Sequence, residues 1–195
     1  MLESIRVENT TKNGSAFDAR RFRNALGRFA SGVAVVTVRH GDHPHGTTVN
    51  SFTSVSLDPP LILVSLDNRS VMHGLLPSIG RYGVSVLAHD QEPLSNHFAG
   101  RTVENLALRF VHHGGIPLLE DAVAHFVVEI VDTHPAGDHT LYIGRVEHFE
   151  CREGKPLLFY AGRYGQLHVE KAPSPGLWQD EFSLFSIGPF DPPIP

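Results

Sequence analysis

The chain of 195 residues contains one cysteine, Cys151, and no long apolar run. A single cysteine excludes an intrachain disulfide and is typical of a reduced, cytoplasmic protein. No stretch approaches the roughly 18 apolar residues of a membrane-spanning helix, and residues 1–9 lack the apolar core of a secretory signal. We therefore expect a soluble cytoplasmic domain with no membrane partner.

Positive charge and the common nucleotide motifs are also scarce. Lysine and arginine number 16 against 21 aspartates and glutamates, and the net charge of −5 gives no electrostatic footprint for nucleic acid. The patterns G-x-G-x-x-G, G-x-x-x-x-G-K-[ST] and G-x-S-x-G do not occur, which argues against a Rossmann site, a P-loop and an esterase-type nucleophile. A nucleotide would have to bind through another architecture.

Histidine is the abundant metal-ligand type, with 13 in the chain. His40, His43 and His45 crowd one predicted loop, and His112 adjoins His113. The pattern H-E-x-x-H is absent, and one cysteine excludes cysteine-rich zinc sites. We interpret these side chains as solvated loop histidines and expect no metal site.

Apolar periodicity predicts one strand-rich domain at residues 17–170, after a flexible N-terminus at 1–16. Helices are expected at 17–29, 70–79 and 90–99, and strands at 33–38, 46–57, 61–66, 82–88, 123–131, 140–149 and 157–164, with 100–118 irregular. Strands outnumber helices without regular alternation, which favours a mainly β fold with short helices, built as a closed or nearly closed antiparallel barrel. Residues 171–195 combine six prolines with aromatic residues, and we expect this tail to pack on the domain or on a dimer partner.

The segment Gly46–Pro60 is the most unusual part of the chain. It has no charge before Asp58 and carries Asn50 and six hydroxyl side chains: Thr47, Thr48, Ser51, Thr53, Ser54 and Ser56. Short donors and acceptors beside apolar anchors suit a flat ligand with a polar edge, and a flavin is the first candidate. Composition alone leaves an ordinary edge strand with one wet face as the alternative.

Two neighbouring segments strengthen the ligand interpretation. Ser65–Ser70 leads into a predicted helix, and a helix N-terminus attracts anions through its free N–H groups and dipole. Arg69 and the Ser70 hydroxyl could add charge-assisted contacts to a phosphate there. Gly137–His139 is a turn followed by a strand, where an imidazole could meet a ligand, although a surface histidine at a hairpin is the commoner meaning.

With these residues identified, the chain from Phe22 to Tyr164 resembles the flavin reductase-like family, the small reductase components of two-component flavin monooxygenases. The resemblance rests on F-R-N-A-L-G-R-F-A-S-G-V-A-V-V-T, G-T-T-V-N-S-F-T-S-V-S-L-D-P-P-L-I-L-V-S-L, R-Y-G-V-S-V-L, G-D-H and the late G-R-Y, in that order. It implies a split-barrel homodimer in which NADH or NADPH reduces FMN or FAD. The reduced flavin then leaves for a partner monooxygenase.

The resemblance also implies roles for individual residues. His139 is placed on the nicotinamide side and is the catalytic candidate, and Phe98 is an aromatic residue near the flavin. The remaining cofactor-binding candidates belong to the hydroxyl-rich strand, the phosphate end and the late G-R-Y: Thr48, Val49, Asn50, Ser51, Ser54, Val55, Ser65, Leu66, Asp67, Arg69, Ser70 and Tyr164. Two alternatives keep the fold: a protein with tightly held FMN, or with heme, that transfers electrons without free-flavin turnover, and an enzyme like pyridoxamine-phosphate oxidase.

Overall fold

The structure is a computed structural model that describes residues 17–101 and 103–168. Its helices are α1 (Ala19–Leu26), α2 (Val71–Ile79) and α3 (Glu92–Phe98). Its strands are β1 (Ser31–Gly32), β2 (Ala34–His40), β3 (His43–Val49), β4 (Thr53–Leu57), β5 (Pro60–Asp67), β6 (Arg81–Val86), β7 (Phe110–His113), β8 (Ile116–Leu119), β9 (Ala124–Ala136), β10 (His139–Cys151), β11 (Leu157–Tyr160) and β12 (Arg163–Gln166). The predicted N-terminus at 1–16 and tail at 171–195 lie outside the described residues, so this division of the chain stays a prediction.

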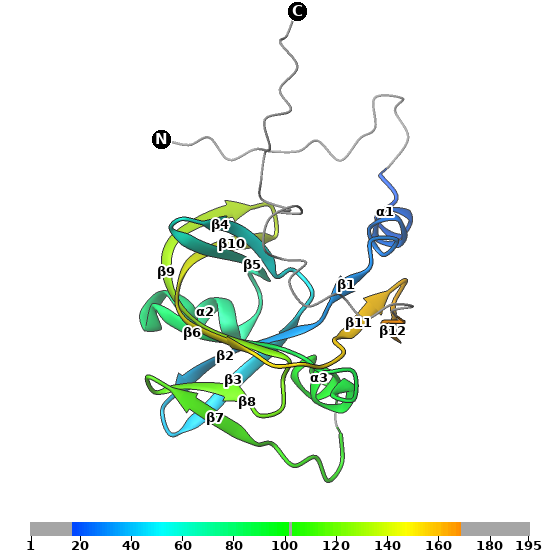
Figure 1. Cartoon of the computed structure of the whole chain (residues 1–195). Helices are drawn as coiled ribbons and strands as arrows, with labels where there is room; N and C mark the ends of the chain where they lie inside the picture. The colour runs from blue at the N-terminus through cyan, green and yellow to red at the C-terminus, as the bar shows by residue number, and fades with distance from the viewer. Residues whose placement is uncertain (1–16, 102, 169–195) are drawn as a thin grey trace, which may run out of the picture.

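Seven strands form one antiparallel sheet in the order β3-β2-β6-β9-β10-β5-β4. The sheet curls around α2 (Figure 1), which contacts β2, β3 and β6 from one half and β5 from the other. The helix therefore fills the gap of an incompletely closed barrel. β1, β11 and β12 form a second small sheet, and β7 pairs with β8. The predicted mainly β, split-barrel fold is confirmed.

β2 lies between two hydrophobic clusters, which explains its continuous run of β-branched residues. Val36 and Val38 belong to the barrel core, where they meet buried residues of α2, β5 and β10. Val35 faces the other way, into a second cluster that also contains Leu87 and Leu157 and supports α3. A strand buried on both faces reads as apolar throughout, whereas a strand with one wet face alternates.

α2 begins at the residue that the sequence predicts as its cap. The Ser70 hydroxyl accepts a hydrogen bond from the His73 N–H at 3.1 Å, and Gly80 ends the helix with φ of +73°. Met72 and Leu76 are fully buried in the barrel core. Because this packing anchors the helix, its N-terminal turn stays directly beyond the end of β5.

β9 and β10 form a long hairpin, with 13 residues in each strand. Its turn is Gly137 and Asp138, and Gly137 has φ of +66°, which glycine adopts without strain. His139 opens β10 directly after the turn. Both strands are longer than predicted, because the polar residues near the turn conceal the strand pattern.

The prediction of one strand across residues 46–57 is wrong. β3 ends at Val49, β4 begins at Thr53, and these are the two end strands of the sheet. In the bend between them, the Ser51 hydroxyl donates to the Ser65 carbonyl oxygen at 2.8 Å and accepts from the Ser65 N–H at 3.1 Å. The bend is therefore tied to β5, a contact that local sequence does not reveal.

Two further hairpins replace elements predicted otherwise. Residues 100–118 are not wholly irregular, since β7 and β8 meet at Gly114 and Gly115, both with positive φ. The single strand predicted at 157–164 is the β11–β12 hairpin, which turns at Ala161 and Gly162. In both cases a glycine in the left-handed region reverses a chain too short to show periodicity.

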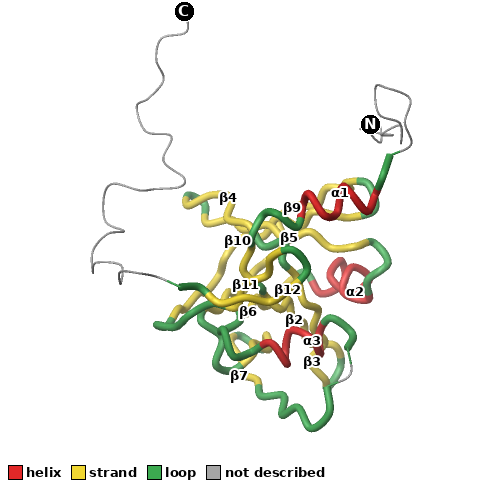
Figure 2. The backbone as a smooth tube through the Cα atoms, turned by 90° about the vertical axis from the view of Figure 1, so that its right-hand side faces the viewer, coloured by secondary structure: helices red, strands yellow, loops and turns green. Residues whose placement is uncertain are grey.

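α1 lies at the periphery of the domain in both views (Figures 1 and 2). It is shorter than the predicted 17–29 helix because Asp18 caps it, accepting from the N–H groups of Arg20 and Arg21 at 3.0 Å. None of its residues is buried, and Phe22 and Leu26 are about half exposed. Within residues 17–101 and 103–168, no helix is long and apolar enough to cross a membrane.

Candidate functional site

A cavity of about 500 Å³ lies beside β3, the first strand in the sheet order. In the part of the chain that the structure describes, β3 has a hydrogen-bonded neighbour on one side only. The start of α2 and the end of α3 contribute the walls, and the lining residues are Pro44, His45, Gly46, Thr47, Val71, Met72, His97, Phe98, Ala99, Gly100, Leu108 and Phe110. Small-molecule pockets typically measure about 300–1,000 Å³.

Phe98, the last residue of α3, packs closely on Gly46 of β3. A β-carbon at Gly46 would lie 2.7 Å from two carbons of the Phe98 ring. Only glycine therefore lets the ring lie directly on the strand. Phe98 also packs against the second cluster, which fixes its position. The aromatic residue predicted near the ligand thus forms a rigid wall of the cavity.

Thr48 contacts α3 and connects it to β12. Its hydroxyl donates to the Ser95 carbonyl oxygen at 2.7 Å, and the Ser95 hydroxyl lies 2.9 Å from the Tyr164 hydroxyl. Ser95 is fully buried, and Tyr164 packs edge-on against Phe159. Tyr164, one of the predicted cofactor-binding residues, therefore supports α3 through Ser95 and does not line the cavity.

Thr48 and Ser51 have little donor capacity left for a ligand. Each hydroxyl carries one proton, and each proton is already donated to a backbone carbonyl oxygen, that of Ser95 or Ser65. These side chains can still accept a hydrogen bond. Donors to the carbonyl oxygens of a bound ring would therefore come from backbone N–H groups of the bend and the strand edge.

The start of α2 has the groups expected of an anion site. Arg69 forms a bidentate ion pair with Asp67, in which Nε donates to Oδ1 at 3.0 Å and Nη2 donates to Oδ2 at 2.6 Å. Hydrogen bonds from the side chain and backbone of Arg69 hold the pKa of Asp67 well below its usual range. The Arg69 side chain is 85% exposed, so its Nη1 remains accessible. The Ser70 hydroxyl, which accepts from the helix, can still donate.

His139 lies beside this helix start, as the sequence-based hypothesis requires. It pairs with Asp67 across β10 and β5, and the Asn68 N–H donates to the Asp138 carbonyl oxygen at 3.0 Å. The Nδ1 atom of His139 is 2.7 Å from the Asp138 carboxylate, a contact that lowers the pKa of Asp138. With its side chain 43% exposed, His139 can reach a ligand through Nε2.

Of the predicted site residues, only Phe98 lines the cavity. The side chains of Val49 and Leu66 face the barrel core. Ser54 and Val55 are exposed on β4 and do not line the cavity, and Asn50 is exposed in the bend. The structure thus separates the candidates into a cavity beside β3, a polar helix start and supporting residues.

Sequence reasoning missed part of the cavity. The interpretation of His45 as a solvated loop histidine is wrong, because His45 lies on β3, is partly buried and lines the cavity. Its pKa is lowered by burial and, to a smaller extent, by His40. Leu108 and Phe110 come from the segment expected to be irregular, where no periodic signal could have identified them.

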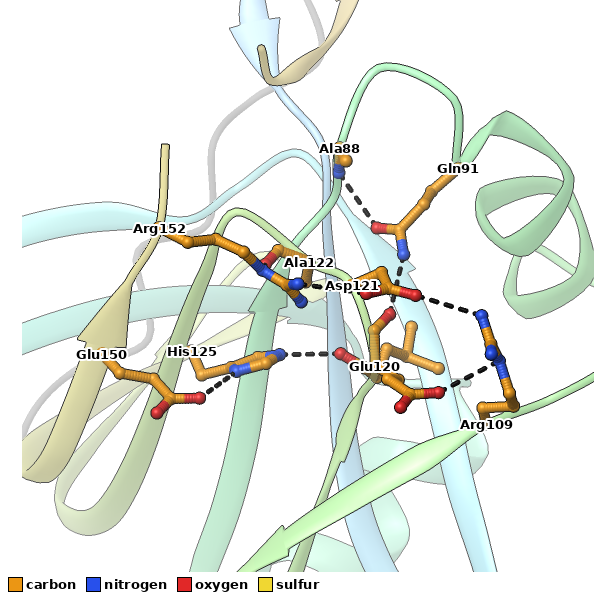
Figure 3. Close-up of polar contacts among 10 residues, drawn as sticks. Ala88, Gln91, Arg109, Glu120, Asp121, Ala122, His125, Glu150 and Arg152 are labelled. Carbon is orange, nitrogen blue, oxygen red and sulfur yellow. Dashed lines mark hydrogen bonds and ion pairs between the residues drawn. The ribbon is translucent and has the colours of Figure 1, made fainter. Parts of the chain in front are cut away.

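A second polar cluster surrounds the turn between β8 and β9 (Figure 3). Asp121 accepts hydrogen bonds from Arg109 and Arg152, both at 3.0 Å, and His125 contacts Glu150 at 2.8 Å. The His125 contact lowers the pKa of Glu150. Asp121 is bonded to both arginines and Arg109 also contacts Glu120, so these contacts hold the turn between β8 and β9. The described segments contain no group of three or more His, Cys, Asp or Glu that could hold a metal ion.

Comparison with known proteins decides the family. The sequence model of the family described as "Flavin reductase like domain" matches residues 26–168. The chain belongs to this family. This flavin reductase-like chain is 52% identical over 150 residues to an NADH-dependent flavin reductase of Rhodococcus sp. The aligned residues cover 75% of this chain and 85% of the relative.

Solved structures of flavin reductases share the fold. The styrene monooxygenase flavin reductase of Pseudomonas putida S12 superposes with a TM-score of 0.71 at 42% identity, covering 76% of this chain and 97% of the other. The NADH:FAD oxidoreductase of Streptomyces globisporus, in complex with NAD and FAD fragments, gives a TM-score of 0.74 at 35% identity and covers 85% and 100% of the two chains.

The residues of the candidate site fit a flavin. The Phe98 ring, seated on Gly46, offers a flat apolar wall, and the edge of β3 offers backbone groups beside it. The start of α2, with Arg69 and Ser70, suits a phosphate. These three features match FMN and FAD, which share a flat ring, a polar pyrimidine edge and a ribityl chain that carries phosphate.

Proposed function

We propose that this chain is an NADH-dependent flavin reductase that reduces FMN or FAD as a diffusible substrate and supplies a partner monooxygenase. The observation that carries the proposal is the cavity beside β3, bounded by Phe98 and the start of α2, in a chain of this family. The Rhodococcus relative is named NADH-dependent, and the Pseudomonas neighbour is named as the flavin reductase of a styrene monooxygenase. These names support NADH as the electron donor and a monooxygenase as the acceptor of reduced flavin.

The chain's part in the reaction is to bind and orient. A bound flavin accepts hydride from nicotinamide, a transfer for which the two cofactors carry the chemistry. Phe98 and β3 would hold the flat face of a flavin ring, and backbone N–H groups near Thr48 and Ser51 would stabilise negative charge on its pyrimidine edge. No side chain of the cavity is needed as an acid or a nucleophile.

The phosphate end is proposed at the start of α2. Arg69 is held in place by Asp67 through Nε and Nη2, which leaves Nη1 for a phosphate oxygen. The Ser70 hydroxyl and the first N–H groups of α2 add further donors. This end of the site is exposed, which favours release of the flavin after reduction.

His139 is proposed to orient the nicotinamide. Its Nδ1 is engaged by the Asp138 carboxylate, so in the neutral ring the proton is on Nδ1 and Nε2 accepts. An accepting Nε2 can take a hydrogen bond from the carboxamide NH₂ of nicotinamide. His139 then selects the ring orientation and transfers no proton.

We also propose a homodimer in the cytoplasm. Support comes from α1 and the turn that follows it, where Phe22 is 50%, Leu26 58% and Phe29 82% exposed. Large apolar side chains exposed together on one short segment are typical of an interaction surface. The single cysteine, Cys151, is consistent with a reducing compartment.

One set of assays tests the proposed function. NADH and NADPH oxidation are measured with FMN and with FAD, each supplied in excess. Rapid NADH oxidation that requires added flavin is the expected result. A yellow protein without free-flavin turnover would support the electron-transfer alternative instead, and formation of pyridoxal phosphate would support the oxidase alternative.

A further inference from the structure

Two tyrosines are buried in the same barrel core but differ in what their hydroxyls contact. Tyr142 is 1% exposed and its hydroxyl lies 2.7 Å from Nδ1 of His73. Tyr82 is fully buried, and its hydroxyl has no hydrogen-bond partner among the described residues. Burial alone raises the pKa of Tyr82. Buried hydroxyls normally have a hydrogen-bond partner, so the informative feature of Tyr142 is which residue its hydroxyl contacts.

The Tyr142–His73 contact joins the two polar elements of the proposed site. His73 lies in the first turn of α2, and its N–H donates to the Ser70 hydroxyl at 3.1 Å. Tyr142 lies on β10, three residues after His139. The two rings also meet edge to face, with centroids 6.0 Å apart. The contact thus connects the helix of the phosphate end to the hairpin of the nicotinamide side.

Two further polar contacts near the turn also connect the hairpin to the segment that leads into α2. The Thr140 hydroxyl donates to Oδ1 of Asn68 at 2.8 Å, and the Asn68 N–H donates to the Asp138 carbonyl oxygen at 3.0 Å. Together with the Tyr142–His73 contact they form three hydrogen-bonded cross-links, one at the turn and two farther along β10. We call Asn68, His73, Thr140 and Tyr142 the hairpin clamp.

Apolar packing does not complete the contact between the two elements. A cavity of about 480 Å³ is lined by His73 and Pro77 of α2 and by Pro135, Thr140 and Tyr142 of the hairpin. Packing in the barrel core and the pairing of β10 with β5 hold the hairpin near α2. At this unfilled end, the polar cross-links adjust the remaining spacing between His139 and the first turn of α2.

The geometry points to Tyr142 and His73 as positioning residues that set the spacing between His139 and the N-terminal turn of α2. This inference rests on the proposed function, since it assigns the nicotinamide and the flavin phosphate to those two elements. A structural role alone would make the same hydrogen bond matter for stability and leave substrate use unchanged.

Tyr82→Phe is a matched control for Tyr142→Phe. The substitution is the same, both residues lie in one core cluster, and only Tyr142 has a bonded hydroxyl. Loss of one neutral hydrogen bond corresponds to a change of about three- to tenfold in an equilibrium constant. We expect Tyr142→Phe to raise KM for NADH about threefold with kcat little changed, the lower end of that range because it acts only through His139, and Tyr82→Phe to leave both constants unchanged.

Hydrogen exchange provides a readout that does not depend on activity. In the protein without ligands, Tyr142→Phe should accelerate exchange of the Asn68 amide and of the amides at 138–141, whereas Tyr82→Phe should not. In the His139→Ala background, Tyr142→Phe should cause no further rise in KM for NADH, because it acts through His139. His73→Asn, which keeps an acceptor close to the position of Nδ1, should behave more like the parent than His73→Leu.

The outcomes separate the inference from the proposed function. If the parent fails to oxidise NADH with added flavin, the proposed function is lost and the exchange data alone judge the clamp. If the parent is active, a Tyr142→Phe protein with parental KM values overturns the positioning role, even when its thermal stability is lowered. Should Tyr142→Phe not fold, the His73→Leu and His73→Asn pair answers the same question.

Discussion

The two helices beside β3 are held in different ways. α3 is anchored by buried polar groups: Ser95 is fully buried and Gln91 is 8% exposed, and both bond to neighbouring segments. The start of α2 is surrounded by exposed groups, with Arg69 85% and His139 43% exposed. The α3 side is a fixed wall, while the α2 side is an open polar end.

This contrast separates two kinds of specificity. A rigid wall selects the shape of the flavin ring, because Phe98 cannot move without disturbing the second cluster. At the exposed polar end, the proposed ligand groups are a phosphate, which FMN and FAD both carry, and the carboxamide of NADH, and weak contacts there would permit exchange. Substitutions on the α3 side should therefore change stability and flavin affinity together, whereas those on the α2 side should change affinity with only a small effect on stability.

The largest expected effect is on the α3 side, from Gly46→Val. The new β-carbon would lie 2.7 Å from the Phe98 ring, which must shift out of the second cluster. Overpacking of this kind costs about 1–3 kcal/mol, and the displaced ring should also weaken flavin binding. Thermal unfolding and a flavin fluorescence titration measure the two effects. Gly32→Val is the control, because a β-carbon at Gly32 meets no atom within 4 Å.

On the α2 side, the double variant Arg69→Ala and Ser70→Ala should weaken flavin binding about tenfold through loss of charge-assisted contacts to phosphate. Riboflavin, which lacks the phosphate, should bind both proteins equally and serves as the control ligand. Unfolding temperature should fall only slightly, since the helix loses one cap. Parental affinity for FMN in this variant would show that the phosphate lies elsewhere.

His139→Ala tests the proposed nicotinamide side of the polar end and should have a somewhat smaller effect than the Arg69 and Ser70 double variant. We expect KM for NADH to rise about fivefold, equivalent to the loss of about one hydrogen bond, with flavin affinity unchanged. His134→Ala, an exposed histidine on β9, is the matched control. If KM and kcat for NADH were the same as in the parent, His139 would be excluded from the site.

The smallest effect concerns acid pH. Arg69 lowers the pKa of Asp67, so the stabilisation from this pair is complete above the usual aspartate pKa and is lost as pH falls through the lowered value. Asp67→Asn should therefore flatten the acid limb of thermal stability below about pH 4 and change nothing at pH 7 beyond a small constant offset. An acid limb as steep as that of the parent would show that the pair does not couple to folding.

The parts of the site that could be predicted from the sequence are those with a local signal. A few adjacent residues are enough to predict Ser70 as a helix cap and His139 at a hairpin turn. The same holds for the hydroxyl-rich segment Gly46–Pro60. The barrel followed from the number of strands and their lack of alternation with helices.

The parts that could not be predicted depend on contacts between distant segments. Ser51 breaks the expected strand because it bonds to Ser65, and Tyr164 supports α3 because Ser95 lies above it. The sequence predicts Val49 and Leu66 at the ligand, although the side-chain alternation of their strands directs both into the core. Only the three-dimensional arrangement settles which side of each strand faces the cavity.

On one side, β3 has no strand neighbour among residues 17–101 and 103–168. An open strand edge is a template on which a second chain can add, and proteins usually protect such edges with charge, proline or a covering segment. A flavin lying along β3 would act as that covering segment while it is bound. Concentrated protein kept without flavin should then self-associate more readily than protein kept with it, so the substrate also serves as a guard against aggregation.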